Sequence, residues 1–221
     1  MNALIPEQNI SIPIKTIFCI GRNYVAHIKE LNHSQSDHPV VFLKPLSALV
    51  YHKESLLLPV DSQDVHHEVE VLLLIGKRAK NVEIKDALSH IKAYGIGIDF
   101  TARDIQKQAI KDGKPWTLAK GFDTFAAVSD FIPAEKIKNP QDLNFSLSVN
   151  NQVKQSSNTK LMIFPIDYLI SYLSQKFTLN EGDLIYTGTP EGVGPVVAGD
   201  IIKAKLGDSL VSLELGVKGF S

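Results

Sequence analysis

Two glutamates in a short apolar segment are the first candidates for chemistry in this chain of 221 residues. Glu68 and Glu70 lie two positions apart in the run HHEVEVLLLIG at 66–76. Because the side chains of a strand alternate between its faces, both carboxylates would point to the same side. Unpaired carboxylates on one face raise each other's pKa, and a divalent cation would relieve their repulsion. A solvated strand end with two surface glutamates is the simpler alternative.

A third carboxylate follows in the segment GIDFTARDIQ at 97–106. Asp99 ends the apolar run 94–99, just before an expected helix. With Glu68 and Glu70 it would complete a set of oxygen ligands that suits Mg²⁺, Mn²⁺ or Ca²⁺ and leaves positions for water and substrate. An aspartate that caps a helix or a turn is the alternative.

A histidine and a glutamate are spaced as neighbours on a helix in GRNYVAHIKE at 21–30. If this segment is helical, His27 and Glu30 share one face. A carboxylate beside an imidazole orients the ring and strengthens it as a base that could activate water. A surface salt bridge is the alternative.

Two lysines lie in surroundings that demand an anionic partner. Lys44 follows the apolar run 40–43 and precedes a proline, and Lys120 follows 115–119 and precedes a glycine. A buried ammonium needs a counter-charge, which a carboxylate substrate or a developing oxyanion could supply. Each lysine could instead extend its ammonium into water.

Further polar residues could hold an anionic substrate. Arg103 and Gln106 lie three positions apart on the expected helix and share a face. The loop YTGTPEGVGP at 186–195 offers glycine backbone amides and the hydroxyl of Thr189. An exposed helix face and a plain turn-rich loop are the alternatives.

These residues need short strands and a few helices to position them. The paired asparagines at 150–151 predict a hairpin turn, because asparagine tolerates positive φ. Thr101 and Asp104 resemble a capping box at the start of a helix. The pattern indicates one mostly-β α+β domain, rolled or sandwich-like. We expect strands at 16–20, 40–43, 69–75, 94–99, 145–150, 184–187, 201–205 and 210–215, and helices at 25–31, 84–91, from 101, and at 165–175.

The composition excludes several other classes of protein. The chain has 23 Lys and Arg against 24 Asp and Glu, a formal net charge of −1, so no basic field would attract nucleic acid or anionic lipid. No apolar run approaches the roughly 18 residues that span a bilayer. The single cysteine, Cys19, is expected to be buried and inert. Together with the lack of a secretory signal, this composition predicts a cytoplasmic protein.

Six segments in this order resemble the fumarylacetoacetate hydrolase family, and most closely its short, single-domain acylpyruvate and fumarylpyruvate hydrolases. The likeness runs from about residue 15 to the C-terminus. The segments that carry it are GRNYVAHIKE at 21–30, VVFLKP at 40–45, HHEVEV at 66–71, GIDFTARDIQ at 97–106, KPWTLAKGFD at 114–123 and YTGTPEGVGP at 186–195.

The resemblance implies a rolled β-rich fold, usually a homodimer, with one catalytic domain over 1–221. Residues 1–14 would be a lead-in and about 24–38 a lid. The metal would be Mg²⁺ or Mn²⁺, held by Glu68, Glu70 and Asp99. In the same resemblance His27 and Glu30 match the water-activating pair, Lys120 matches the oxyanion-stabilising lysine, and Arg22, Lys44, Arg103, Gln106 and Thr189 match substrate-binding positions.

The activity that the resemblance implies is hydrolysis of the C–C bond of an acylpyruvate to pyruvate and a carboxylic acid. His27 would deprotonate the attacking water, and Lys120 would offset the charge on the tetrahedral oxygen. Decarboxylation or tautomerisation of oxaloacetate, or isomerisation or decarboxylation of a hydroxylated dienedioate, are alternatives at the same site. A non-enzymatic β-sandwich that binds Ca²⁺ or sugar is a third possibility.

Overall fold

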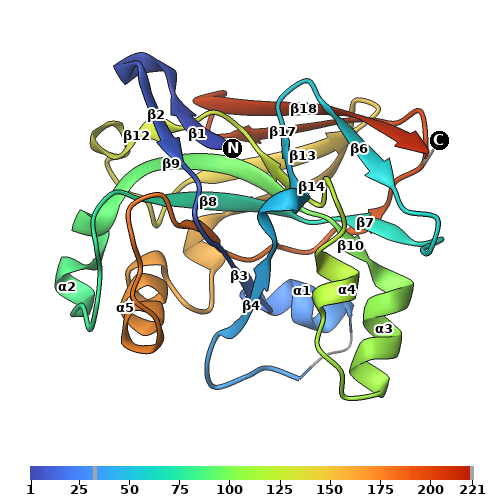
Figure 1. Ribbon diagram of the computed structural model, residues 1–221, viewed down its shortest axis with the longest axis horizontal. Coiled ribbons are helices and arrows are strands. Elements are labelled where there is room, and N and C mark those ends of the chain that lie inside the picture. The colour runs from blue at the N-terminus through green and yellow to red at the C-terminus, as the bar shows by residue number, and fades with distance from the viewer. Residues whose placement is uncertain (32–33, 220–221) are drawn as a thin grey trace.

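The computed structural model describes residues 1–31 and 34–219 and is built around a curled, mixed sheet of eight strands (Figure 1). The strand order is β4-β3-β15-β8-β9-β11-β5, with β12 paired to β9. The pairs β15–β3 and β11–β5 are parallel and the others antiparallel. These strands are β3 (Ile17–Gly21), β4 (Val40–Lys44), β5 (Leu49–Tyr51), β8 (Val69–Ile75), β9 (Ile91–Asp99), β11 (Ala126–Val128), β12 (Ile132–Pro133) and β15 (Leu184–Tyr186).

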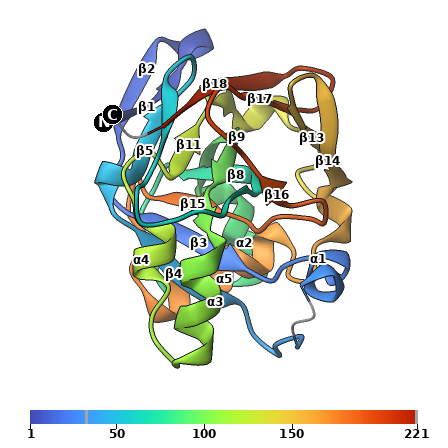
Figure 2. The ribbon, with the colours of Figure 1, turned by 90° about the vertical axis from the view of Figure 1, so that its right-hand side faces the viewer.

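A second sheet of five strands packs on one face of the first (Figures 1 and 2). Its order is β14-β13-β17-β18-β6, and it covers β8 and β9. Together the two sheets confirm the predicted mostly-β α+β fold. The strands of the second sheet are β6 (Ser55–Leu58), β13 (Asn144–Val149), β14 (Gln152–Asn158), β17 (Ile201–Leu206) and β18 (Val211–Gly219).

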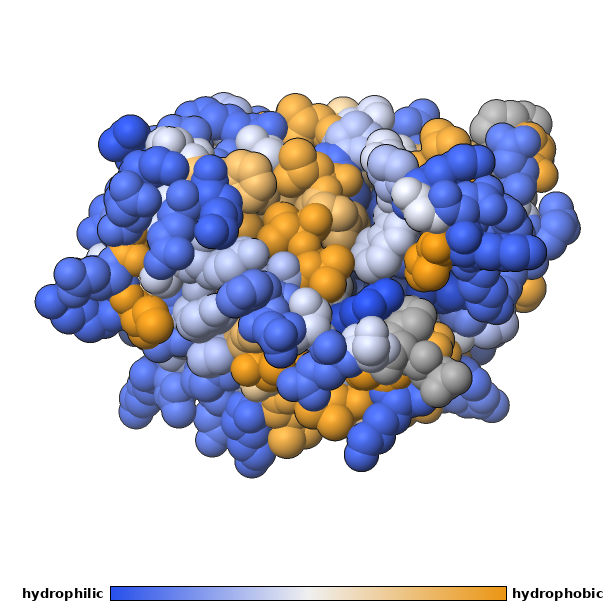
Figure 3. Space-filling view, turned by 90° about the horizontal axis from the view of Figure 1, so that it is seen from below, coloured by the Kyte–Doolittle hydropathy of each residue, from blue (hydrophilic) through white to orange (hydrophobic). Residues whose placement is uncertain are grey.

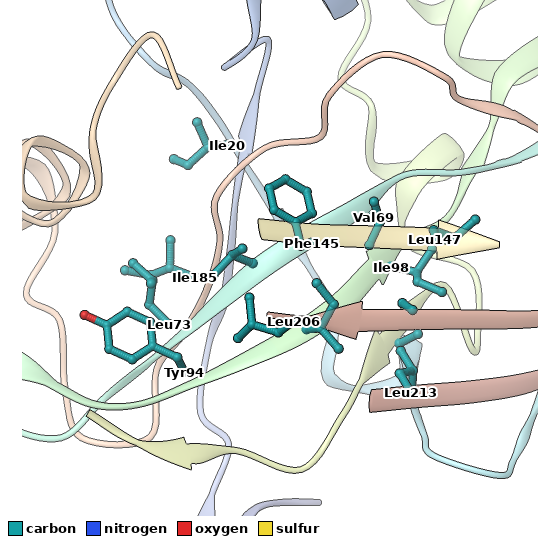
Figure 4. Close-up of a cluster of buried hydrophobic side chains, with 14 of the residues drawn as sticks. Ile20, Val69, Leu73, Tyr94, Ile98, Phe145, Leu147, Ile185, Leu206 and Leu213 are labelled. Carbon is teal, nitrogen blue, oxygen red and sulfur yellow. The ribbon is translucent and has the colours of Figure 1, made fainter. Parts of the chain in front are cut away.

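The side chains of β8 alternate strictly between its two faces, so the eight-stranded sheet contributes to two hydrophobic cores. Val69, Val71 and Leu73 face the second sheet and pack with its inner side chains, as the close-up in Figure 4 shows for part of this cluster. Leu72 and Leu74 face the other side and join a smaller cluster. Glu70 has the same parity as Leu72 and Leu74, so its carboxylate is directed away from the larger core.

All eight predicted strands are present, and so is the predicted hairpin. Asn150 and Asn151 join β13 to β14 with φ angles of 51° and 65°, the positive values that a tight hairpin turn requires. Cys19 lies in the smaller core with no exposed surface, as expected.

The helices flank the sheets (Figures 1 and 2). The predicted helix at 165–175 is α5, whose apolar side buries Ile166, Leu169, Ile170 and Leu173. The predicted helix at 84–91 divides into α2 and the 3-10 turn η3. No helix in the described part of the chain is long and apolar enough to cross a membrane. The helices are α1 (Val25–Glu30), α2 (Ile84–Ala87), α3 (Arg103–Lys111), α4 (Thr117–Lys120) and α5 (Ile166–Lys176), with 3-10 turns η1 (Pro6–Gln8), η2 (Leu46–Ala48), η3 (Leu88–His90), η4 (Ala134–Lys136) and η5 (Thr159–Leu161).

The predicted capping box at Thr101 and Asp104 is wrong. Thr101 belongs to the short strand β10 (Thr101–Ala102), which pairs with β7 (Val65–His67), and β7 also pairs with β16 (Gly194–Pro195). Ala102 is the N-cap of α3, and Asp104 accepts hydrogen bonds from the Ser62 hydroxyl (2.7 Å) and the Gln63 amide (2.9 Å). Pairing with β7 therefore outweighs the local capping preference.

The first fourteen residues are more structured than a lead-in. They form the hairpin β1 (Asn2–Ile5) and β2 (Ile10–Pro13), which contributes Ala3, Ile5 and Ile12 to the smaller core. The proposed lid at about 24–38 contains α1, and residues 32–33 of it lie outside the described residues. At its far end His38 stacks on Tyr172 of α5, with ring centroids 6.0 Å apart. Movement of this segment remains a prediction.

Candidate active site

Three carboxylates converge at one end of the eight-stranded sheet. Glu68, Glu70 and Asp99 each offer an oxygen within 4.8 Å of the other two, and all three side chains are buried. The register explains their convergence, because Glu70 lies opposite Gly97 on β9 and the Asp99 amide donates to the Glu68 carbonyl at 2.8 Å. Adjacent antiparallel strands thus bring together residues about 30 positions apart in the chain.

Two cations compensate this charge on the cavity side. Lys120 Nζ lies 2.9 Å from Glu68 Oε2 and 2.6 Å from Asp99 Oδ2, while the Arg103 guanidinium contacts Glu68 Oε1. Burial raises the pKa of Glu68, but the attraction of Lys120 and Arg103 outweighs it and holds the pKa well below its ordinary value. Burial lowers the pKa of Lys120, but Asp99 and Glu68 overcome this effect and raise it.

Glu70 is the carboxylate with the least compensation. It accepts a hydrogen bond of 2.6 Å from the Gly188 amide. Burial, and then the charges of Asp99 and Glu68, raise its pKa well above the ordinary value. An anionic Glu70 therefore needs another positive charge nearby. The clustered oxygens and this shortfall fit a divalent cation with hard oxygen ligands.

The Gly188 amide is held in place by a close contact between two loops. Gly188 has a φ of +102°, and a Cβ there would lie 2.6 Å from the Cβ of Asn23. Asn23 is fully buried, donates to the carbonyls of Thr187 (2.8 Å) and Phe164 (3.1 Å), and accepts from the Phe164 amide (2.7 Å). It joins the start of α1 to the loop after β15.

His27 and Glu30 form the expected pair on α1. Nδ1 of His27 lies 3.3 Å from Oε2 of Glu30, and the other Glu30 oxygen accepts from the Gly192 amide at 3.0 Å. Burial lowers the pKa of His27 below 6.5, although Glu68 and the bond to Glu30 act in the opposite direction. The ring is therefore neutral at pH 7, and the bonding pattern assigns the proton to Nδ1, which leaves Nε2 as the basic nitrogen.

Lys44 does not occupy the predicted substrate-binding position. Its fully buried ammonium lies 2.7 Å from Asp99 Oδ1 and donates to the carbonyls of Phe100 (3.1 Å), Phe125 (2.8 Å) and Lys120. It is absent from the described residues that line the cavity around the carboxylates. An ammonium in an apolar strand satisfies its charge on the nearest carboxylate and on carbonyl groups, so Lys44 supports Asp99 from behind.

The other predicted residues meet in one cavity. Arg22, His27, Arg103, Gln106 and Thr189 line it together with the three carboxylates and Lys120. Glu30 lies behind His27 and is connected to the cavity through its contact with that ring. The apolar part of the wall includes Phe42 and Trp116, whose rings meet edge to face at 5.6 Å. A small acid bound at the carboxylates would therefore have both polar groups and aromatic rings within reach of its tail.

Sequence reasoning missed Gln155 on β14. Its side chain is buried, donates to Thr189 Oγ1 (2.9 Å) and the Pro190 carbonyl (3.1 Å), and accepts from the Val69 amide (3.0 Å). It therefore fixes the loop after β15 relative to the start of β8. A glutamine in a polar strand carries no local signal of this role. Trp116 was also missed, although it is the single tryptophan of the chain.

One enzyme family matches this chain over most of its length. The chain belongs to the fumarylacetoacetate hydrolase family: the sequence model described as "Fumarylacetoacetate (FAA) hydrolase C-terminal" matches residues 16–218. Its structure is similar to that of fumarylpyruvate hydrolase from Pseudomonas aeruginosa in complex with Mn²⁺ and pyruvate, with a TM-score of 0.95 and 32% identity, covering 100% of this chain and 96% of that one. This neighbour and the acidic triad together indicate a divalent metal.

Individual relatives and structural neighbours are named for different activities. The chain is 45% identical to the mitochondrial oxaloacetate tautomerase FAHD1 of Mus musculus, over 92% of each protein. It is 44% identical to the mitochondrial oxaloacetate decarboxylase of Dictyostelium discoideum, over 86% of this chain and 87% of that protein. It also resembles the structure of 5-carboxymethyl-2-hydroxymuconate delta-isomerase from Mycobacterium smegmatis, with a TM-score of 0.84 and 37% identity, covering 96% of this chain and 81% of that one.

Proposed function

We propose that this enzyme uses a divalent metal to enolise a small 2-oxo acid, with oxaloacetate as its substrate in a tautomerase or decarboxylase reaction. The observation that carries the proposal is the buried cluster of Glu68, Glu70 and Asp99 beside Lys120. When bound there, Mg²⁺ or Mn²⁺ would act as a Lewis acid on the 2-oxo group. The names of the relatives that are 43–45% identical support this choice of substrate.

The residues of the chain supply the remaining parts of the reaction. Glu68, Glu70 and Asp99 would hold the cation, and Lys44 keeps Asp99 in place. Lys120, with its raised pKa, remains a cation at pH 7 and would stabilise negative charge that develops on a substrate oxygen. Nε2 of His27 would accept a proton from the substrate or from water.

Hydrolysis of acylpyruvates is a second candidate, favoured by the His27–Glu30 pair. That reaction needs a base for the attacking water, and the pair has the required order of contacts, with Glu30 holding Nδ1 of the ring. The fumarylpyruvate hydrolase neighbour supports this reading. Both reactions share the enolate-stabilising part of the site, so one protein could perform both.

The deciding experiment is an assay of oxaloacetate tautomerisation, oxaloacetate decarboxylation and acetylpyruvate cleavage, each with Mg²⁺, with Mn²⁺ and after chelation. We expect oxaloacetate turnover that disappears on chelation and returns with the metal. His27→Ala separates hydrolysis from oxaloacetate decarboxylation, because hydrolysis requires an activated water and tautomerisation a base for the substrate proton, whereas metal-assisted decarboxylation needs neither. Turnover that survives exhaustive chelation would contradict the proposal.

A homodimer, which the family resemblance implies, is part of the same proposal. The surface offers apolar area for such contact: Figure 3 shows apolar atoms gathered near the middle of the lower face. The apolar side chain of Leu118 on α4 is 75% exposed beside Ile105 and Pro115. Sedimentation equilibrium would test the state, with a monomer as the contrary result.

A further inference from the structure

Arg22 is the cationic side chain on the cavity wall that the reaction leaves without a role. Within residues 1–31 and 34–219, no carboxylate lies within 4.0 Å of its guanidinium, and its Nε is buried without a hydrogen-bond partner. The other two cations of the wall, Arg103 and Lys120, are each paired with a metal-site carboxylate. Arg22 is therefore free to bind an anion that enters the cavity.

The backbone holds Arg22 in a conformation that a side chain rarely adopts. Its φ is +60°, in the left-handed region, where the Cβ of a non-glycine residue crowds the backbone. Asn23, through its bonds to Thr187 and Phe164, fixes the chain immediately after it. Strain that the surroundings enforce is typical of functional positions.

An aromatic ring orients the guanidinium. The Cζ of Arg22 lies 5.8 Å from the centre of the Trp116 ring, a cation–π distance. The preceding Gly21 allows this approach, because a Cβ there would already lie 3.3 Å from Trp116 Cζ3. A guanidinium that is held over a ring through its charge keeps its N–H groups available for a carboxylate, which it can bind through two parallel hydrogen bonds.

The charges around the cavity also favour a substrate with two negative charges. Four carboxylates lie on the cavity wall or directly behind it, and four cationic groups balance their charge. Because His27 is neutral, a bound divalent ion would give the cavity a net excess of two positive charges. A 2-oxo monocarboxylate would neutralise one of them, and a dicarboxylate both. The carboxylates are Glu30, Glu68, Glu70 and Asp99, and the cations are Arg22, Lys44, Arg103 and Lys120.

We propose that Arg22, which lies over the Trp116 ring, binds the distal carboxylate of the substrate and makes the site selective for 2-oxo dicarboxylates over acylpyruvates with a neutral tail. This inference rests on the proposed function and narrows its substrate class. Oxaloacetate and acetylpyruvate form a matched pair, since they differ in a carboxylate oxygen against a methyl group at the distal end. Arg22 would thus discriminate between substrates that share the same 2-oxo carboxylate end and differ in their tails.

The test measures binding apart from turnover. Calorimetric titration of the Mn²⁺-loaded protein would use L-malate and 2-hydroxy-4-methylpentanoate, which share the 2-hydroxy acid end and are isosteric at the distal end. We expect Arg22→Gln to weaken malate binding by about 10- to 100-fold, the loss of a charge-assisted pair, and to change binding of the neutral-tailed acid less than about threefold. The ratio of kcat/KM for oxaloacetate and acetylpyruvate should fall in parallel.

Two further variants keep the result interpretable. Arg22→Gly retains the positive φ without strain and should repeat the selective loss if Arg22→Gln does not fold. The exposed Arg78→Gln removes an equal charge in the segment after β8 and should leave both affinities unchanged. Equal losses for both acids, or wild-type binding that ignores the distal carboxylate, would overturn the role of Arg22. Failure of the wild type to turn over any oxo acid would instead refute the proposed function.

Discussion

The ammonium of Lys44 lies 2.7 Å from Oδ1 of Asp99, while Lys120 contacts the other oxygen of the same carboxylate at 2.6 Å. One lysine is behind the metal-site residue and the other is on the cavity wall. Burial lowers the pKa of Lys44, and the charge of Asp99 opposes this effect. Asp99 is thus held between two lysines with different tasks, one structural and one available to substrate.

Lys44→Met should destabilise the fold more than it harms substrate binding. Removing one partner of a buried ion pair typically costs about 3–5 kcal/mol, and here it leaves Asp99 Oδ1 without its ammonium while Lys120 still contacts Oδ2. Chemical denaturation of the metal-free protein measures the loss, with the exposed Lys77→Met as the control. A stability equal to that of the wild type would contradict the supporting role.

Glu68→Gln should abolish tight metal binding. The substitution preserves shape but removes a charge from the carboxylate cluster, and it also leaves Lys120 and Arg103 without one counter-ion. We expect oxaloacetate turnover to fall by at least about 10²-fold, comparable to the loss of one charge-stabilising group. Metal content after dialysis checks the cause, because full occupancy in an inactive variant would contradict it.

Metal affinity should fall as the pH falls. The pKa of Glu70 in the metal-free protein is raised by burial, so a proton competes with the cation for this carboxylate. Below that pKa the apparent Kd for Mn²⁺ should rise by up to about tenfold per pH unit, because each bound ion then displaces one proton. Titrations between pH 5 and 8 measure the slope, and a flat profile would contradict the prediction.

Glu30→Gln should have two effects on acetylpyruvate hydrolysis. Glu30 raises the pKa of His27 against the larger effect of burial, so its removal should move the acid limb of the pH–rate profile to lower pH. The weaker, less well oriented base should lower kcat by about 10²-fold. Oxaloacetate decarboxylation is the internal control. An acid limb displaced to higher pH would show that Glu30 acts in another way.

Gly188→Ala should impair both stability and metal binding. An added methyl group would lie 2.6 Å from Asn23 Cβ and displace the amide that contacts Glu70. Gly199→Ala is the matched control, since Gly199 has a similar φ of +95° with no atom within 4 Å of the added carbon. We expect a clearly larger fall in Tm for position 188, and equal falls would assign the effect to φ alone.

The strands could be predicted because they depend on local rules, and alternation also predicted that Glu68 and Glu70 share one face. The place of Asp99 beside them depends on the register of β8 with β9, and it was predicted from the chemistry of an all-oxygen ligand set and from the resemblance to the family. The direction of Lys44 could not be predicted, because its partners Phe100 and Phe125 meet it only after the sheet forms. The capping box failed for the same reason: the register of β10 with β7 is a tertiary property.

The three clustered carboxylates and the polar residues near α1 come from different segments of the chain, which affects how new substrate specificities could arise. The carboxylates Glu68, Glu70 and Asp99 lie on or beside the two central strands β8 and β9, whereas Arg22, His27 and Glu30 come from a single stretch of nine residues between β3 and the end of α1. Under the roles proposed above, exchanging that stretch between relatives would alter proton transfer and recognition of the substrate tail, while Glu68, Glu70 and Asp99 would be unchanged. Chimeras of this kind would change the substrate preference of the enzyme by exchanging one short segment.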